Sequence, residues 1–168
     1  MKMLLGTLAA ALALSAPHSA SAAPSAALAP LFAAREGWLN GEVTAHGLAG
    51  KVVVVDIFTF GCYNCRNVVP ELRHVFRADR ADVVIVGIHS PETPYERDRS
   101  NVVANLRAQG IEWPVAIDNS FALWNAYGVE AWPTQLFFDR KGRLRKTVVG
   151  DSQDDAVEQT IRALVSEK

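Results

Sequence analysis

Two cysteines that follow an unbroken apolar run constrain this chain more than any other feature. Cys62 and Cys65 are its only two cysteines, and their two-residue spacing is too short to staple a fold but suits a disulfide that opens and closes. The run 52–58 before them is apolar and β-branched except at Asp56, a pattern typical of a central strand buried on both faces. We therefore expect a buried strand, a short turn and a helix that opens at Cys62.

The rest of the chain alternates between strand-like and helix-like segments. Apolar residues recur at helical spacing from Cys62 to about Arg77, and Pro70 inside this segment predicts a kinked helix. The next apolar run, 82–89, is strand-like, so that strand, helix and strand imply a right-handed parallel unit. The further expected elements are helices at 101–109 and 121–127, strands at 114–117, 134–138 and 144–149, and a last helix capped by Asp151 or Ser152. This order predicts an α/β fold with a central mixed sheet flanked by helices and a helical insertion after the second core strand.

The first 22 residues have the pattern of a secretory signal peptide. Lys2 gives a positive start, Leu4–Ala16 is an apolar run of small residues and leucines, and Ala20–Ala22 is a small–x–small cleavage site. The apolar run is shorter than the roughly 20 residues needed to span a bilayer, although an uncleaved N-terminal anchor is the alternative. We expect cleavage after Ala22 and a periplasmic or secreted mature protein.

Length and composition predict one domain behind this segment. A chain of 168 residues with 49% hydrophobic content can fill one core of ordinary size. Residues 23–37 begin Ala/Pro/Ser-rich and are expected to form a flexible lead-in, with the domain at 38–168. The formal net charge of −1 argues against a nucleic-acid-binding or membrane-surface protein, which usually has a basic face. We expect a monomer that binds no nucleic acid.

Export changes how the cysteine pair is interpreted. In an oxidising compartment a lone pair is disulfide-bonded unless a reductant acts on it. Half a zinc site is the alternative for a cytosolic protein, but there is no second cysteine pair, and His46, His74 and His89 do not fall at a ligand spacing. We expect no metal and no cofactor, and the chemistry is assigned to Cys62 and Cys65 themselves.

Thiol–disulfide exchange requires a reactive thiolate. The first turn of a helix offers unpaired N–H groups and the positive end of the dipole, which favour the charged form of Cys62. Cys65 lies one turn further on and deeper. Cys62 is therefore predicted to attack a substrate disulfide, and Cys65 to resolve the resulting mixed disulfide. Tyr63 and Asn64, between the cysteines, are predicted to contact the substrate.

Asp56 and Pro133 complete the set of candidate catalytic residues. Asp56 is predicted to lie beneath the pair, to have a raised pKa and to take the proton of Cys65; the alternative is a carboxylate satisfied by backbone N–H groups. Pro133 follows an aromatic residue and precedes a late strand, which favours a cis peptide; the alternative is an ordinary trans proline. If Pro133 packs opposite Cys62, the backbone of Trp132 can pair with an extended substrate strand.

With these residues placed, the chain resembles the thioredoxin-like superfamily. Asp56, the cysteine pair and Pro70 keep the relative spacing of thioredoxin's buried aspartate, active-site cysteines and helix-kinking proline. The run Trp132-Pro133-Thr134 resembles its cis-proline loop. Among extracytoplasmic members the chain is similar to the TlpA-like proteins, and in particular to the thioredoxin-like domain of DipZ-type proteins. The stretches that carry this similarity cover most of residues 38–150 and include Trp38-Leu39-Asn40, His89-Ser-Pro-Glu92, Pro114–Asn119 and Trp124–Gly128.

The resemblance implies a thioredoxin fold, a redox-active disulfide of Cys62 and Cys65, and an enzyme that reduces protein disulfides. It also implies electron supply from a membrane thiol reductase of the DsbD or CcdA type, and work in cytochrome c maturation or in repair of wrong disulfides. DipZ-type proteins carry a membrane domain in the same chain, so here the reductase is expected to be a separate protein. Gly61 stands where many thioredoxins have tryptophan, and Tyr63-Asn64 replaces Gly-Pro. Both positions tune the redox potential, which leaves the direction of electron flow open.

Two other functions are alternatives. A thiol peroxidase shares the fold but needs a Thr/Pro-x-x-x-Thr-x-x-Cys setting; Thr59 lies three residues before Cys62, but position 55 is valine. A periplasmic copper-binding chaperone would hold Cu(I) with both thiolates. No Met-rich or His-rich segment supports the copper chaperone, and a proline opposite the thiols works against it.

Overall fold

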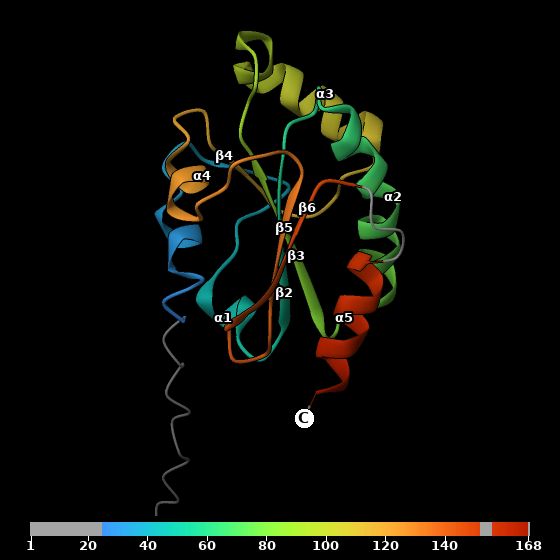
Figure 1. Cartoon of the computed structure of the whole chain (residues 1–168). Helices are drawn as coiled ribbons and strands as arrows, with labels where there is room; N and C mark the ends of the chain where they lie inside the picture. Colours follow the sequence, from blue (N-terminus) through green and yellow to red (C-terminus); the bar gives the residue numbers. More distant parts are fainter. Residues whose placement is uncertain (1–24, 152–155, 168) are drawn as a thin grey trace, which may run out of the picture.

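The computed structural model describes residues 25–151 and 156–167. These residues form a six-stranded mixed sheet with helices on both faces (Figure 1). This architecture confirms the predicted α/β class and the thioredoxin-like fold. The predicted signal peptide at 1–22 and the cap at Ser152 lie outside the described residues.

The strand β2 (Val52–Phe58) lies in the interior of the sheet. In chain order the six strands are β1 Trp38–Leu39, β2 Val52–Phe58, β3 Val83–His89, β4 Val115–Ile117, β5 Thr134–Phe138 and β6 Leu144–Val149, and their order across the sheet is β1-β4-β3-β2-β5-β6. β2 pairs in parallel with β3, and β3 with β4. On the other side β2 pairs with the antiparallel β5, which pairs with β6. Because β2 has a neighbour on each edge and helices on each face, its seven residues are all buried.

Helices lie on both faces of the sheet. They are the 3-10 helices η1 Ala29–Ala33 and η2 Pro94–Arg97, and the α-helices α1 Ala45–Leu48, α2 Tyr63–Ala78, α3 Arg99–Gln109, α4 Ala122–Ala126 and α5 Ala156–Ser166. Figure 1 shows α2 and α5 on one side of the sheet and α1 and α4 on the other. Between β3 and β4 lie η2 and α3, which are the predicted helical insertion. Within the described ranges, no helix is both long and apolar enough to cross a membrane.

Two of the predicted helices differ in detail from the structure. The helix predicted to open at Cys62 begins at Tyr63, with Cys62 as its N-cap, and it continues through Pro70 to Ala78. The helix predicted at 121–127 is shorter, because Phe121 has a left-handed backbone with a φ of 60° and therefore precedes the helix.

The alternation of side chains along β2 divides the core into two clusters. Val52, Val54 and Phe58 pack with residues of α2 and α5, whereas Val53 and Val55 pack with residues of η1, α1 and α4 on the opposite face. Successive side chains of a strand point to opposite faces. Asp56 therefore shares the face that α2 covers.

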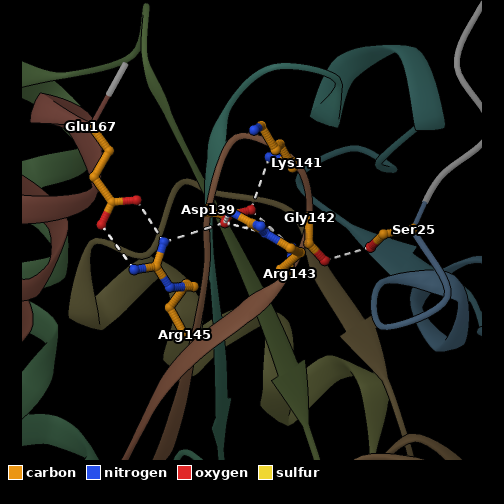
Figure 2. A network of polar contacts seen from close by, with 7 residues as sticks. All are labelled: Ser25, Asp139, Lys141, Gly142, Arg143, Arg145 and Glu167. Atoms are coloured by element: carbon orange, nitrogen blue, oxygen red, sulfur yellow. Dashed lines mark hydrogen bonds and ion pairs between the residues drawn. The ribbon is translucent and has the colours of Figure 1, made fainter.

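The described part of the segment 23–37 packs on the domain. Leu31, in η1, is fully buried, and Leu28 just before it is nearly so; both belong to the second cluster. Ser25 Oγ donates a hydrogen bond of 2.5 Å to the carbonyl oxygen of Gly142 (Figure 2). Burial of these two leucines therefore extends the packed structure ahead of the expected boundary at residue 38.

The turn between β5 and β6 is organised by the buried carboxylate of Asp139 (Figure 2). Its Oδ1 accepts hydrogen bonds from the backbone N–H groups of Lys141 and Arg143, and its Oδ2 accepts from the side chains of Arg143 and Arg145. Burial acts to raise the pKa of Asp139. The hydrogen bonds from Arg143 and Lys141, with the charge of Arg143, outweigh burial and lower this pKa to about 2. The hairpin is therefore held by an ionised aspartate.

Candidate active site

Cys62 and Cys65 form a disulfide at the N-terminus of α2, with their Cα atoms 5.3 Å apart. Cys62 is the N-cap residue, and its sulfur accepts a hydrogen bond from the backbone N–H of Cys65 at 3.1 Å. Cys62 is half-buried, whereas Cys65 is only 3% exposed. A substrate disulfide can therefore reach Cys62 but not Cys65.

The sequence of α2 explains this difference between the cysteines. Cys65 belongs to the buried face of the helix, together with Val68, Val69, Leu72 and Val75. Residues three and four positions apart lie on one helical face. Burial of this apolar stripe against the sheet orients Cys65 inward, and Cys62 lies at the end of the stripe where the helix begins.

Asp56 faces the same core cluster as Cys65. It is 3% exposed, and its Oδ1 accepts a hydrogen bond of 2.9 Å from Gln135 Nε2 on β5. Burial raises the pKa of Asp56 to about 7, although the Gln135 hydrogen bond acts in the opposite direction. No backbone N–H of the described residues donates to this carboxylate, so a carboxylate satisfied by the backbone does not describe Asp56.

The peptide bond between Trp132 and Pro133 is cis, as the sequence predicts. The pairing of Thr134 with Ile57 places this loop beside the carboxyl end of β2, which is also the end from which the chain enters α2. Pro133 is buried and Trp132 is half-buried. Within residues 25–151 and 156–167, the backbone N–H and C=O of Trp132 have no hydrogen-bond partner. Both groups are therefore available to an extended peptide.

A polar network that the sequence analysis missed supports this loop. Trp132 Nε1 donates to the carbonyl oxygen of Ser90 at 3.0 Å, and Ser90 Oγ donates to Asp118 Oδ2 at 2.8 Å. The buried Asp118 also accepts hydrogen bonds from the backbone N–H groups of Leu123 and Trp124, which lie in the first turn of α4. An aspartate placed between a short strand and a helix is the signal that could have identified this interaction with the helix N-terminus.

The two residues between the cysteines lie at the surface. Tyr63 is 69% exposed, and Asn64 is exposed as well. The Arg66 guanidinium lies 5.7 Å from the centre of the Tyr63 ring, and its Nη1 donates to the carbonyl oxygen of Gly61 at 3.4 Å. Solvent-facing side chains here can contact a bound substrate.

Cys62 and Cys65 are joined at the start of the helix that follows β2, an interior strand of the mixed sheet. This arrangement defines a thioredoxin-fold thiol–disulfide protein. The chain belongs to the Redoxin family, whose model matches residues 23–164. Family and disulfide together confirm the predicted thiol–disulfide chemistry.

Individual relatives agree with this assignment. Protein DipZ of Mycobacterium bovis is 29% identical over 136 residues, which are 78% of this chain and 20% of DipZ. The chain thus spans about a fifth of the length of that relative. Thiol-disulfide oxidoreductase YkuV of Bacillus subtilis is 25% identical over 82% of this chain and 94% of its own length. The crystal structure of a thiol-disulfide isomerase from Corynebacterium glutamicum has a TM-score of 0.69 and 29% identity, and covers 79% of this chain and 92% of that chain.

Proposed function

We propose that this protein is an extracytoplasmic thiol–disulfide oxidoreductase that reduces disulfides in other proteins. The observation that carries the proposal is the asymmetry of the pair: Cys62 is half-buried at a helix N-terminus, while Cys65 is buried behind it. A nucleophile must be accessible, and a resolving thiol must be protected from the same substrate. The two cysteines meet these opposite requirements within one helical turn.

In the first step the Cys62 thiolate attacks one sulfur of the substrate disulfide. A bond forms between Cys62 and that sulfur, and the other substrate sulfur leaves as a thiolate that takes up a proton from solvent. The N–H groups of the first turn of α2 stabilise the negative charge on Cys62 before the attack.

In the second step Cys65 attacks the sulfur of Cys62 and releases the reduced substrate. Cys65 must lose its proton inside the core, where solvent does not reach it. Asp56 is the assigned acceptor, because it faces the same cluster and burial raises its pKa to about 7. An acid with that pKa accepts a proton readily and returns it to solvent near neutral pH.

Substrate is assigned to the surface around Cys62. The free backbone groups of Trp132 would pair with an extended segment of the substrate, as strands add to a sheet edge. Tyr63 and Asn64 would contact the same segment beside the reactive sulfur, because both are exposed.

The predicted signal peptide supports a periplasmic or secreted location. In that setting the pair needs an external source of electrons, and a membrane thiol reductase of the DsbD or CcdA type is the proposed donor. Substrates would be protein disulfides formed wrongly or formed during cytochrome c maturation. The similarity to DipZ supports this assignment.

Single cysteine variants test the proposal. C62S should abolish the reduction of insulin disulfides, because the attacking thiolate is gone, whereas C65S should trap Cys62 in a mixed disulfide with insulin. Gel electrophoresis without reductant detects the trapped species, and turbidity follows insulin reduction. Insulin reduction by C62S at the wild-type rate would overturn the assignment.

A further inference from the structure

The residue before the attacking cysteine is in contact with a buried carboxylate from the helical insertion. A Cβ atom built on Gly61 would lie 2.0 Å from Glu96 Oε1, a distance that real Cβ atoms do not reach. Gly61 does not have a positive φ, so its backbone alone does not require glycine. The absence of a side chain at position 61 therefore accommodates Glu96.

Glu96 is held firmly in this position. It is 3% exposed, and it lies in η2, where it completes a capping box with Thr93. Its Oε2 accepts hydrogen bonds from the backbone N–H groups of Glu92 at 2.6 Å and of Thr93 at 2.8 Å. Charge-assisted bonds of this kind stabilise the negative form of a carboxylate. The insertion thus fixes one negative charge beside Gly61.

The neighbouring groups do not neutralise this charge. His89 interacts electrostatically with Glu96, but burial lowers the pKa of His89 to about 4 against this attraction, so the ring is neutral at pH 7. Among the described residues, Glu96 forms no ion pair. Arg66 donates to the carbonyl oxygen of Gly61, but it is exposed, and solvent screens its charge. Asp56 adds a second acidic group on the Cys65 side.

We propose that Glu96 tunes the redox equilibrium of the pair by opposing the Cys62 thiolate. This inference rests on the proposed function and adds the direction of electron flow. The reduced protein carries a thiolate at Cys62, whereas the disulfide form carries no charge there. A fixed negative charge nearby therefore destabilises only the reduced form. Glu96 thus makes the protein a better reductant. The N-terminus of α2 has the opposite effect, because it stabilises the Cys62 thiolate.

The electron count of the reaction shows where the charge matters. The thiolate of Cys62 and the thiol of Cys65 give two electrons to a protein disulfide. The products are the Cys62–Cys65 disulfide, one substrate thiolate and one substrate thiol. The negative charge thus leaves the neighbourhood of Glu96 when the substrate is reduced, and repulsion from Glu96 favours that direction.

The size of the effect follows from the geometry. Consecutive Cα atoms are about 3.8 Å apart, so the Glu96 carboxylate lies within about 10 Å of the Cys62 sulfur. At an effective dielectric constant of about 20 to 30, repulsion between two unit charges at this separation corresponds to roughly a tenfold change in an equilibrium constant. For a two-electron couple, tenfold corresponds to about 30 mV.

E96Q tests the proposal with little change of shape, because the amide oxygen can accept both backbone hydrogen bonds. The matched control is E92Q, the same chemical change in the same loop at an exposed carboxylate. The equilibrium of each protein with reduced and oxidised glutathione gives its potential, and thiolate absorbance in the ultraviolet gives the pKa of Cys62. E96Q should favour the reduced dithiol about tenfold, shift the potential by about 30 mV toward less negative values, and lower the pKa of Cys62. E92Q should match the wild type.

The pH profile separates a charge effect from a structural one. The difference between E96Q and the wild type should vanish at low pH, where Cys62 is a neutral thiol, and grow as the thiolate forms. A difference that is the same at every pH, or none relative to E92Q, would refute the role of Glu96. If E96Q does not fold, G61A gives the second test, because its methyl group displaces the carboxylate and should shift the potential in the same direction; an unchanged potential in G61A refutes the proposal as well.

These readouts do not depend on the turnover of a protein substrate. If wild type reduces insulin and E96Q has the potential of E92Q, only the role of Glu96 is wrong. If C62S reduces insulin as well as wild type does, the proposed function itself is wrong, whatever the potentials are.

Discussion

Asp56→Asn removes the buried acid on the face of β2 that α2 covers, and we expect two measurable consequences. The pKa of Asp56 is about 7 in the folded protein, against an ordinary value of 3.8. Since the folded pKa is the higher one, the folded state binds more protons between these values. The stability due to the neutral acid is complete below pH 3.8 and is lost as the pH rises to about 7. At 1.36 kcal/mol per pH unit, the free energy of unfolding falls by about 4 kcal/mol over this window.

D56N should escape this loss, because an amide carries no charge to bury. We expect its free energy of unfolding to match that of the wild type near the lower end of the window and to exceed it above neutral pH by about 4 kcal/mol. The hydrogen bond to Gln135 can survive the change. Gln135 Oε1 has no partner among the described residues, so a flipped Gln135 amide would accept from the new side chain.

Urea unfolding of the oxidised protein across this pH range is the assay, since an intact disulfide prevents the thiols from titrating. The matched control is D79N, which makes the same change at an exposed aspartate after α2 and should keep the wild-type pH dependence. A pH dependence in D56N equal to that of the wild type would refute the idea that Asp56 is the destabilised buried acid.

The same variant should also slow the resolving step. Loss of a general base typically reduces the rate of a proton-transfer step about 100-fold or more, so D56N should accumulate the mixed disulfide that the wild type resolves. Rapid quenching followed by electrophoresis measures this species. A variant that gains stability at high pH but resolves at the wild-type rate would show that Asp56 is buried without serving Cys65.

Two further predictions concern the scaffold. Asp139→Asn should reduce the free energy of unfolding at neutral pH by about 2 kcal/mol, because the pKa of Asp139 in the folded protein is about 2, below the ordinary 3.8. The stability that the ionised Asp139 contributes is present above pH 3.8 and is lost as the pH falls to about 2. Urea unfolding at neutral and acidic pH measures it, and an equal loss at both would contradict it. Leu31→Ala should cost about 3 kcal/mol in the same assay, because Leu31 is fully buried. F32A, at an exposed neighbour, is the control and should cost much less; a loss in L31A no larger than that in F32A would contradict the prediction.

The core of the fold could be predicted because its signals are local. The apolar run around Val54 and the helical spacing after Cys62 indicate β2 and α2, and both exist close to the predicted bounds. Strand alternation also fixes the face of Asp56 once α2 is known to cover that face. Pro133 could be singled out because a proline after an aromatic residue and before a strand is a recognisable local pattern, and its peptide bond is cis.

The missed features depend on contacts between distant segments. Ser90 and Asp118 support the Trp132 loop only because β3 and β4 end at the same edge of the sheet, and no local pattern reports that neighbourhood. The packing of Leu31 depends on the second face of the sheet, whereas an Ala/Pro/Ser-rich composition near it suggested a free segment. Glu96 is an extreme case, because its contact with Gly61 requires the precise placement of η2.

The contact between Glu96 and Gly61 gives the helical insertion a role beyond packing. An insertion that only enlarged the domain would not need a buried carboxylate at its first turn, because burying a charge is costly unless partners compensate it. Here two backbone N–H groups within the insertion compensate the charge, and the carboxylate is directed at the residue before Cys62. In the proposed mechanism Asp56 and Glu96 act on different quantities. Asp56 would set how fast Cys65 resolves the mixed disulfide, whereas Glu96, beside Gly61, would set the redox equilibrium of the pair. An enzyme with this division could change its potential through the insertion without changing the core that carries its proton transfer.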